Sequence, residues 1–351
     1  MHKKLATVAQ ITDFDTIIDV RSPAEFLEDH IPGAQNCPVL DDDERIKVGT
    51  LYKQVSAFEA RKVGAALVAH NIAKILENGF LERVKNWRPL IYCWRGGQRS
   101  AALTHVMREI GWDAHQLAGG YKFWRRHVLT QLDVLPEQID FRVISGATGS
   151  GKSRLLESLS AHGAQVLHLE HLAAHKGSVL GGLPGQNQPT QRGFDTNLFT
   201  AIAKLSADRP VYVEAESRKI GSVQLPEKLM AALRRAPCLR MEVKLAARVD
   251  FLLEDYRYAL QDTAWLASNI ERLHSLQSRS TLARWQHFIQ IGEFRQLVEE
   301  LLTLHYDPQY LRSQKHNYVE HQAARVLNVD QLTQAALDAI SRELVARPTT
   351  S

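Results

Sequence analysis

The distribution of hydrophobic and polar residues divides the chain into alternating strands and helices. Short apolar, β-branched runs bounded by polar residues are typical of buried strands, and apolar residues at helical spacing indicate amphipathic helices. In the first part of the chain we expect strands at Thr16–Val20 and Pro89–Tyr92, and helices at Pro23–Glu28, Ala57–Leu76 and Ala101–Glu109. Strands that alternate with helices predict a parallel α/β sheet.

A second α/β region begins at Phe141–Ser145, where a strand-like run is followed at once by a glycine-rich loop and a helix. The segment Gly177–Arg192 is rich in Gly, Pro and Gln and predicts a long surface loop, which at that length is more often functional than structural. From Ala247 onward the pattern is helical. Further strands are expected at Ala164–Leu169, Pro210–Val213 and Leu239–Leu245.

These patterns predict three segments. Residues 1–132 form a first α/β domain, residues 133–246 form the core of a second, and residues 247–351 form a helical part that completes the second. The boundary is expected near Leu129–Gln138. A chain of 351 residues fits about two domains, at roughly 100–200 residues each.

The composition narrows the class of protein without naming an activity. With 44% hydrophobic and 23% charged residues, intrinsic disorder and low complexity are excluded. The three cysteines include no CxxC pair, which excludes a disulfide framework and a thiolate zinc site and fits a reducing cytoplasm. We expect no signal peptide and no membrane span, because no apolar run is long enough. A net charge of +4 permits nucleic acid as a partner without requiring it.

The first candidate site is a cysteine at the end of a predicted strand, in the sequence YCWRGGQRS. Loop amides and a helix N-terminus converge at such a turn, which favours an anion and lowers the pKa of a thiol. Cys93 is therefore the candidate nucleophile, whereas Cys37 and Cys238 lack such surroundings and are expected to be buried as small hydrophobic residues. The remaining members of the expected anion-binding loop are Arg95, Gly96, Gly97, Arg99 and Ser100.

Two further segments, Ile17–Pro38 and His115–Trp124, resemble the rhodanese family. That resemblance implies a loop cysteine that carries sulfur or selenium, on a domain spanning about the first 130 residues. Most of the matching residues are expected to be structural, with Asp19 and Arg21 forming a pair and Gly33 permitting a turn. The matching residues are Asp19, Arg21, Glu25, Phe26, His30, Ile31, Gly33, Ala34, Gly119, Gly120, Tyr121 and Trp124.

The spacing from Cys93 to Arg99 is C-x5-R, which also resembles a phosphatase branch of the same fold. In that pattern a histidine usually precedes the cysteine, and here Tyr92 does. We therefore hypothesise a loop sized for a phosphate-like donor that serves chalcogen transfer, which phosphate inhibition of the transfer step would test.

The second candidate site is the segment GATGSGKS, which fits G-x-x-x-x-G-K-[ST] between a predicted strand and a predicted helix. Its backbone N–H groups would surround a β-phosphate, Lys152 would neutralise phosphate charge, and Ser153 could ligate Mg²⁺. ATP, GTP or another diphosphate would satisfy the same amides. The phosphate-binding residues are Gly146, Gly149, Ser150, Gly151, Lys152 and Ser153.

Two acids and a base follow the strand Pro210–Val213: Glu214, Glu216 and Arg218. An acid at this strand end could order a metal-bound water beside the phosphate loop, and the alternative is a solvated strand end with a helix cap. The pattern does not choose between the two glutamates.

Taken with both motifs, three blocks make nearly the whole chain resemble the tRNA 2-selenouridine synthase family: His175–Gly182, Gln188–Asp195 and Val213–Gly221. The fold implied is α/β, with an N-terminal rhodanese-like domain followed by a P-loop NTPase-like parallel-sheet domain and its helical C-terminal part. In one place the match departs from expectation, because His168 stands where an acid is expected.

The resemblance implies a cytoplasmic transferase that replaces sulfur by selenium in the wobble 2-thiouridine of tRNA. Selenophosphate is the implied donor, and geranyl diphosphate is implied to give an S-geranyl intermediate that is then selenated. Mg²⁺ is a candidate cofactor, and a selenophosphate-supplying enzyme is a candidate partner. Whether Cys93 carries selenium or assists its delivery stays open at this stage, as does whether the phosphate loop holds a nucleotide or geranyl diphosphate.

Basic residues with aromatic neighbours are candidate tRNA contacts, since such clusters suit backbone contact and base stacking. An ordinary solvated helix face is the alternative for each cluster. The candidates are Lys122, Arg125 and Arg126, interleaved with Phe123 and Trp124, then Arg234 and Arg235, and then Arg284 and Trp285.

Three other functions compete with the tRNA-modifying transferase. A kinase or NTPase with a rhodanese-like regulatory module would turn over nucleotide without tRNA. A C-x5-R phosphatase or arsenate reductase would act through Cys93 alone. A non-enzymatic tRNA-binding protein is disfavoured by two intact catalytic-type loops.

Overall fold

The computed structural model describes residues 4–178, 180–182, 185–317 and 324–347, without the side chains of residues 313–317. The chain divides into two compact units, Met1–Gln131 with Asp195–Thr200, and Leu132–Phe194 with Ala201–Ser351. No helix among the described residues is long and apolar enough to cross a membrane.

The first unit is built on a five-stranded parallel sheet in the order β1-β5-β4-β2-β3. The strand predicted at Pro89–Tyr92 is confirmed as the central strand β4, which is buried along its whole length. The other strands are β1 (Leu5–Ala6), β2 (Thr16–Asp19), β3 (Ala34–Asn36) and β5 (His115–Leu117). The helices are η1 (Val8–Asp13), α1 (Pro23–Glu28), α2 (Asp42–Gln54), α3 (Ala57–Gly79), α4 (Gln98–Ile110) and α5 (Gly120–Val134).

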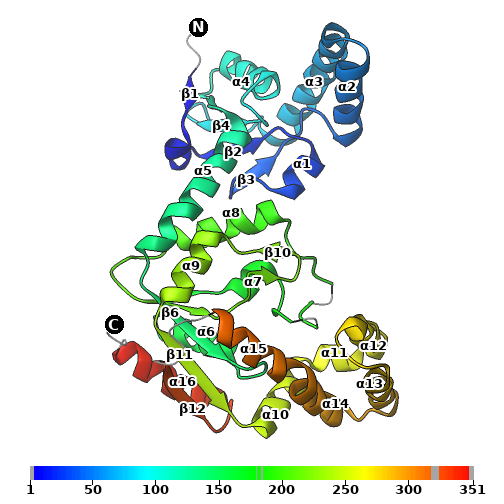
Figure 1. The fold of residues 1–351 in the computed structure, drawn as a ribbon. Helices are drawn as coiled ribbons and strands as arrows, with labels where there is room; N and C mark the ends of the chain where they lie inside the picture. The colour runs from blue at the N-terminus through cyan, green and yellow to red at the C-terminus, as the bar shows by residue number, and fades with distance from the viewer. Residues whose placement is uncertain (1–3, 179, 183–184, 318–323, 348–351) are drawn as a thin grey trace. The chain divides into compact units, whose positions relative to one another are not determined.

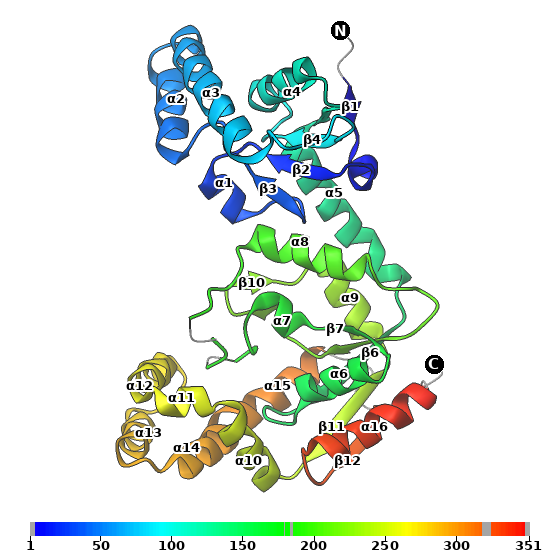
Figure 2. The ribbon, with the colours of Figure 1, turned by 180° about the vertical axis from the view of Figure 1, so that it is seen from behind.

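Helices α2 and α3 lie side by side in both views (Figures 1 and 2). Helix α3 was predicted, whereas α2 was not, because its exposed apolar residues, such as Ile46 and Tyr52, give no amphipathic pattern. Helix α5 continues to Val134 and a short η2 (Leu135–Gln138) follows it, so the expected boundary segment is helical.

The second unit holds another five-stranded parallel sheet, in the order β12-β11-β6-β8-β7. A two-stranded antiparallel hairpin, β9–β10, accompanies it. The strands are β6 (Phe141–Gly146), β7 (Gln165–Leu167), β8 (Val211–Glu214), β9 (Lys219–Ile220), β10 (Val223–Gln224), β11 (Cys238–Val243) and β12 (Arg325–Val329). The two parallel sheets confirm the predicted α/β class.

The helices of this unit cover the sheet and extend beyond it. Helices α6 and α16 pack together over the sheet, and Figure 2 shows α11 to α14 gathered into a separate helical group. The helices are α6 (Lys152–Ala161), α7 (Leu169–Ala173), α8 (Gln191–Ile202), α9 (Glu227–Arg235), α10 (Leu245–Asp255), α11 (Arg257–Gln261), α12 (Thr263–Glu271), η3 (Arg272–Ser275), α13 (Arg279–Ile291), α14 (Phe294–Glu300), the π-helix η4 (Leu301–Tyr306), α15 (Asp307–Asn317) and α16 (Gln334–Ala346).

The sequence pattern predicted that the segment after Ala247 is helical, but this segment also contains a strand. Its strand β12 returns to the edge of the sheet and pairs in parallel with β11. The strand is half exposed, and only Leu327 and Val329 are buried, so it lacks the continuous apolar run of the central strands.

Candidate functional site

The phosphate loop follows β6 and ends at α6, which begins at Lys152. Gly149 and Gly151 both have φ of +78°, and a Cβ on either would approach a leucine side chain, Leu252 at 2.8 Å or Leu332 at 2.7 Å. Both positions therefore require glycine. The loop amides and the N-terminus of α6 give this place a preference for anions.

Two basic side chains donate hydrogen bonds to backbone carbonyl oxygens of the phosphate loop. Lys152 donates from Nζ to the carbonyl oxygen of Gly146 at 3.0 Å. Arg248, which is buried, donates from Nε to the carbonyl oxygen of Thr148 at 2.9 Å and is paired with Asp307 at 2.6 and 3.0 Å. The Arg248–Asp307 pair therefore ties the phosphate loop to the start of α15.

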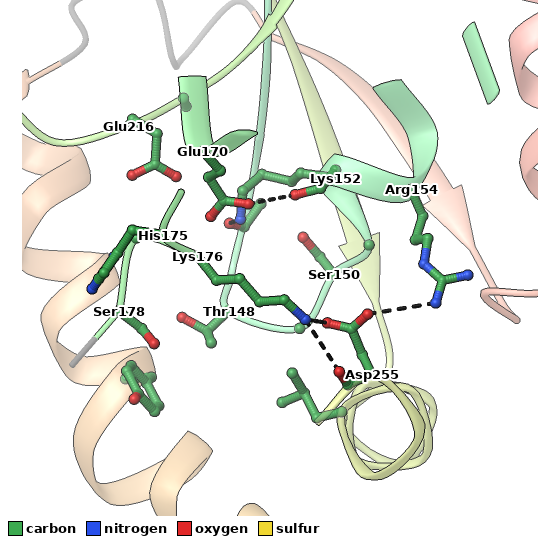
Figure 3. Close-up of a pocket in the computed structure, with 18 of the residues that line it drawn as sticks. Thr148, Ser150, Lys152, Arg154, Glu170, His175, Lys176, Ser178, Glu216 and Asp255 are labelled. Carbon is green, nitrogen blue, oxygen red and sulfur yellow. Dashed lines mark hydrogen bonds and ion pairs between the residues drawn. The ribbon is translucent and has the colours of Figure 1, made fainter. Parts of the chain in front are cut away.

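A cavity of about 790 Å³ opens in front of the phosphate loop (Figure 3). Its walls come from the loop, from the segment after α7, from the end of β8 and from α10, η4 and α15. The long loop predicted after Gly177 contributes Gly177, Ser178 and Gln186 to the wall, which supports a functional role for it.

Acidic side chains gather at the carboxyl ends of β7 and β8, next to the phosphate loop. Glu170 accepts a hydrogen bond from the Ser153 hydroxyl at 2.6 Å, and its own N–H donates to Glu214 Oε1 at 2.8 Å. A Cβ on Gly177 would lie 2.9 Å from Glu216 Oε2 and 3.1 Å from Glu170 Oε1, so both carboxylates face this glycine. Parallel strand order explains the meeting, because β7, β8 and β6 are adjacent.

Two of these acids have raised pKa values. Burial, with the nearby charge of Glu170, raises the pKa of Glu214 to about 8, and Glu214 Oε2 has no hydrogen-bond partner in the described structure. Burial and the charge of Glu170 also raise the pKa of Glu216 to about 8, against the lowering effect of Lys152. Burial therefore favours the neutral form of both carboxyl groups more than water does.

Position 168 holds a histidine where an acid was expected, and the nearby acid is Glu170. His168 precedes α7, stacks on His171 at 4.4 Å between ring centroids, and has its pKa lowered to about 4 by burial and by His171. The carboxylate that contacts the phosphate loop stands two residues later. The sequence offered a signal for it, since Glu170 follows the end of a predicted strand as Glu214 does.

The Ser153 hydroxyl and the Glu170 carboxylate are oxygen ligands of the kind that Mg²⁺ binds. A hydroxyl and a carboxylate oxygen are ligands that Mg²⁺ takes together with phosphate oxygens and waters. Within the described ranges no group of three or more His, Cys, Asp or Glu side chains is arranged to hold a metal. A Mg²⁺ ion would therefore be held by Ser153 and Glu170, with the phosphates of the ligand completing its shell.

The cysteine loop lies in the first unit, between β4 and α4. Cys93 is buried, and its Sγ accepts hydrogen bonds from the Gly97 N–H at 3.2 Å and the Ser100 hydroxyl at 3.1 Å. These two donors fix the position of the sulfur atom in the loop. Cys37 has a pKa raised to about 11 by burial and the charge of Asp19, and Cys238 donates to Ser145 at 3.1 Å, so both are held in apolar or paired surroundings.

The two arginines of the cysteine loop do not surround Cys93 as expected. Arg99 pairs with Glu25 at 2.6 Å, and Arg95 is exposed. Burial would raise the pKa of Glu25, but the hydrogen bond and charge of Arg99 outweigh it and hold that pKa below its usual value. Because the Arg99 guanidinium is paired with Glu25, the C-x5-R spacing does not leave this arginine available to bind a phosphate.

The start of α5 packs directly on the cysteine loop. A Cβ on Gly120, at φ +57°, would lie 2.2 Å from the carbonyl oxygen of Cys93, which explains the glycine. The Tyr121 N–H donates to that same oxygen at 2.9 Å. Gln116, which the sequence did not single out, donates from Nε2 to the carbonyl oxygens of Gly96 and Gly97 and to Ser100.

The predicted Asp19–Arg21 pair is confirmed as a fully buried ion pair, at 2.6 Å. Arg21 also donates to the carbonyl oxygen of Asp29 at 2.6 Å and stacks over the Tyr121 ring at 4.0 Å. Gly33, at φ +80°, makes the expected turn. Phe26 and His30 stack on each other, Ile31 and Trp124 are buried, Ala34 begins β3, and Gly119 has φ +71°.

With the geometry described, comparison with known proteins identifies the family. A family model described as a tRNA 2-selenouridine synthase AAA domain matches residues 139–274, and a rhodanese-like domain model matches residues 3–127. A tRNA 2-selenouridine synthase from Marinobacter nauticus is 31% identical over 330 residues, covering 84% of this chain and 87% of that protein. The chain belongs to the tRNA 2-selenouridine synthase family.

Other tRNA 2-selenouridine synthases give the same assignment. The Bdellovibrio bacteriovorus protein is 30% identical over 350 residues, covering 86% of this chain and 90% of its own length. The Nitrosomonas europaea protein is 38% identical over 244 residues, covering 68% of this chain, and that match spans 63% of its length. Among solved structures, a rhodanese-related protein from Thermoplasma volcanium is 20% identical, with a TM-score of 0.22, over 35% of this chain and 92% of that one.

Several residues predicted to contact tRNA are exposed in this member of the tRNA 2-selenouridine synthase family. Lys122, Phe123 and Arg126 are exposed on α5, and Arg234 and Arg235 are exposed on α9. Arg125, in contrast, is largely buried and pairs with Asp195.

The prediction that Trp285 stacks on a base is wrong, because its side chain is fully buried. Its Nε1 donates to Glu300 at 2.9 Å, and Arg284 pairs with the same carboxylate at 2.8 Å. The helical pattern places Trp285 in the core of the α12–α14 group. Arg218 is exposed and is not among the residues that line the cavity, although its neighbour Ser217 is.

Several residues that line the cavity, besides Glu170, were not predicted from the sequence. Lys176, Asp255 and Tyr256 line the cavity and are joined by close contacts. Lys176 lay within a block that carried the family resemblance, whereas Asp255 and Tyr256 lay at the end of a helix with no local signature.

Proposed function

We propose that this chain replaces sulfur by selenium in the wobble 2-thiouridine of tRNA, with selenophosphate as donor and an S-geranyl-2-thiouridine intermediate made from geranyl diphosphate. Membership of the tRNA 2-selenouridine synthase family supports the selenation of tRNA. The proposal includes the cytoplasm as the place of action, Mg²⁺ as a cofactor and a selenophosphate-supplying enzyme as a partner.

The observation that carries the geranyl step is an apolar cavity that borders the cavity in front of the phosphate loop. A second cavity, of about 50 Å³, shares Thr148, Ser178, Leu252, Tyr256 and Tyr306 with the cavity in front of the phosphate loop. Its remaining lining is apolar, and consists of Leu180, Ala259, Leu260, Trp265, Leu266, Leu297, Val298, Leu301 and Leu302.

An amphiphilic diphosphate matches this arrangement better than a nucleotide. The phosphate loop suits the diphosphate, and burial of a hydrocarbon contributes roughly 0.8 kcal/mol for each CH₂ group. The second cavity is narrow, so in this proposal it takes the far end of the prenyl chain, while the first part of the chain lies in the larger cavity.

In the alkylation step the thiouridine sulfur attacks C1 of the geranyl group. A carbon–sulfur bond forms, the bond from C1 to the bridging oxygen breaks, and its electron pair leaves with diphosphate. The N3 proton of the base passes to solvent. Lys152 and the amides around Gly149 to Ser153 bind the departing charge.

In the selenation step we assign delivery to Cys93. Its thiolate attacks the phosphorus of selenophosphate, the phosphorus–selenium bond breaks, and the released selenide attacks C2 while the sulfur leaves as geranyl thiol. Water then hydrolyses the phosphocysteine to orthophosphate. Hydrogen bonds from Gly97 and Ser100 to Sγ hold the nucleophile in place for this attack.

The test uses purified protein and tRNA that carries wobble 2-thiouridine, with nucleosides analysed by mass spectrometry. Geranyl diphosphate should give S-geranyl-2-thiouridine, and added selenophosphate should convert it to 2-selenouridine. Excess orthophosphate should slow the second reaction. Release of phosphate from ATP or GTP without tRNA, with no change in nucleosides, would instead indicate a kinase or NTPase.

The apolar cavity has a separate test. Leu260→Trp would fill part of it, and should raise KM for geranyl diphosphate about tenfold while inorganic diphosphate binds as before. Leu276→Trp is the matched control, because Leu276 is 58% exposed and lines neither cavity. An unchanged KM in Leu260→Trp would place the prenyl chain elsewhere.

A further inference from the structure

Lys176 presents a second ammonium group to the cavity in front of the phosphate loop. It belongs to the segment after α7, and Figure 3 shows its side chain extending toward Asp255. Its side chain is 26% exposed. The backbone around it turns tightly, since Lys176 N–H donates to Gly181 and its carbonyl oxygen accepts from Ser178, both at 2.8 Å.

This ammonium group is held by Asp255, the last residue of α10. Lys176 Nζ donates to Asp255 Oδ2 at 2.5 Å and to its carbonyl oxygen at 3.1 Å. The ammonium also lies over the Tyr256 ring at 4.4 Å and the Tyr258 ring at 5.4 Å. Carboxylate and aromatic faces together fix a flexible cation at the cavity wall.

Asp255 serves a second cation as well. Arg154, on α6 and 41% exposed, approaches Asp255 Oδ1 at 3.5 Å. One carboxylate is therefore shared between Lys176 and Arg154, and the three side chains together carry one surplus positive charge. A diphosphate that enters the cavity competes with this single carboxylate for Lys176.

We propose that Lys176 is a second phosphate-binding residue. It gives up its contact with Asp255, binds the diphosphate instead, and stabilises this group as it departs. This inference rests on the proposed function. As the bond from C1 to the bridging oxygen breaks, its electron pair passes to diphosphate, and Lys176 pairs with that charge opposite Lys152 and the loop amides. Asp255 positions Lys176 before the ligand arrives and takes no part in the bond changes.

A purely structural role for the Lys176–Asp255 pair makes a different prediction. If the pair only ties the segment after α7 to α10, removal of either partner should cause the same loss. If Lys176 binds the ligand, loss of its charge should be harmful, whereas loss of the Asp255 charge should leave Lys176 free to bind.

The experiment compares Lys176→Met, Lys176→Arg and Asp255→Asn in the full-length protein. Lys176→Met should weaken binding of inorganic diphosphate about tenfold and lower kcat for alkylation of thiouridine tRNA at least as much. Lys176→Arg should restore most of both, and Asp255→Asn should bind diphosphate at least as tightly as the unchanged protein. The control is Lys244→Met, since Lys244 is 80% exposed and pairs with Asp330.

Equal losses in Lys176→Met and Asp255→Asn, or no rescue by Lys176→Arg, would overturn the proposal. Melting temperatures of all variants separate loss of folding from loss of binding. If the unchanged protein makes no S-geranyl nucleoside, the proposed function fails. If it makes the nucleoside and Lys176→Met binds diphosphate and turns over equally well, only the role of Lys176 fails.

Discussion

The carboxylate of Glu170 lies 2.6 Å from the hydroxyl of Ser153 and accepts its hydrogen bond. This contact joins the end of β7 to the first turn of α6, where the phosphate loop ends. Glu214, at the end of β8, in turn holds the backbone N–H of Glu170. Strands β7 and β8 therefore bring acidic side chains to the phosphate loop that follows β6.

Replacement of Glu170 should weaken the diphosphate-dependent step. In Glu170→Gln the charge beside Ser153 is lost while the shape is kept, so we expect kcat/KM for geranyl diphosphate to fall about tenfold or more and the Mg²⁺ requirement to rise. The measurement is a Mg²⁺ titration of S-geranyl nucleoside formation. Glu227→Gln is the control, because Glu227 is exposed and does not line the cavity. An unchanged Mg²⁺ profile in Glu170→Gln would remove Glu170 from the metal site.

The raised pKa of Glu214 predicts a pH dependence of stability. Folding raises this pKa from 4.5 to about 8, so between these values the folded state holds a proton that the unfolded chain has released. The unfolding free energy must therefore fall as the pH rises through this window. In Glu214→Gln the contribution of this one proton is absent, so the unfolding free energy should fall less between pH 5.5 and pH 8. Urea unfolding at the two pH values measures the difference.

Glu227→Gln is the control for this measurement, because Glu227 is exposed on α9. A pH dependence in Glu214→Gln as steep as that of the unchanged protein would show that Glu214 is already ionised in the folded state at neutral pH.

The contact between Gly120 and Cys93 predicts a selective defect. In Gly120→Ala the new Cβ would collide with the Cys93 carbonyl oxygen, so the cysteine loop must shift. We expect a large loss of 2-selenouridine formation with S-geranyl nucleoside formation retained, as measured by nucleoside analysis. Gly79→Ala is the control, since a Cβ there meets nothing within 4 Å. Normal selenation in a folded Gly120→Ala protein would contradict the assigned role of this loop.

Much of the fold was readable because the central strands carry local patterns. Pro89–Tyr92 and Phe141–Gly146 are buried runs, and each is followed by a glycine-containing loop and a helix. The strand β12 was not readable, since its pairing with β11 joins residues more than eighty positions apart and its own pattern is half exposed.

The candidate site was readable only as far as its residues are close in sequence. Lys152 and Ser153 stand in one motif, but Glu170, which contacts Ser153, and Asp255, which contacts Lys176, come from separate elements that only the fold brings to the cavity. Trp285 shows the reverse error, because a tryptophan beside an arginine suggests base stacking while helical packing buries its ring.

The central claim is that one chain holds two separable chemical steps, one at the phosphate loop and one at Cys93. The direct measurement is nucleoside analysis of tRNA from cells that lack the protein, complemented with the unchanged protein, Cys93→Ala or Lys152→Ala. Cys93→Ala should lose 2-selenouridine and retain or accumulate S-geranyl-2-thiouridine, whereas Lys152→Ala should lose the geranylated nucleoside. Identical nucleoside profiles for the two variants, or unchanged nucleosides in the deletion, would contradict the account.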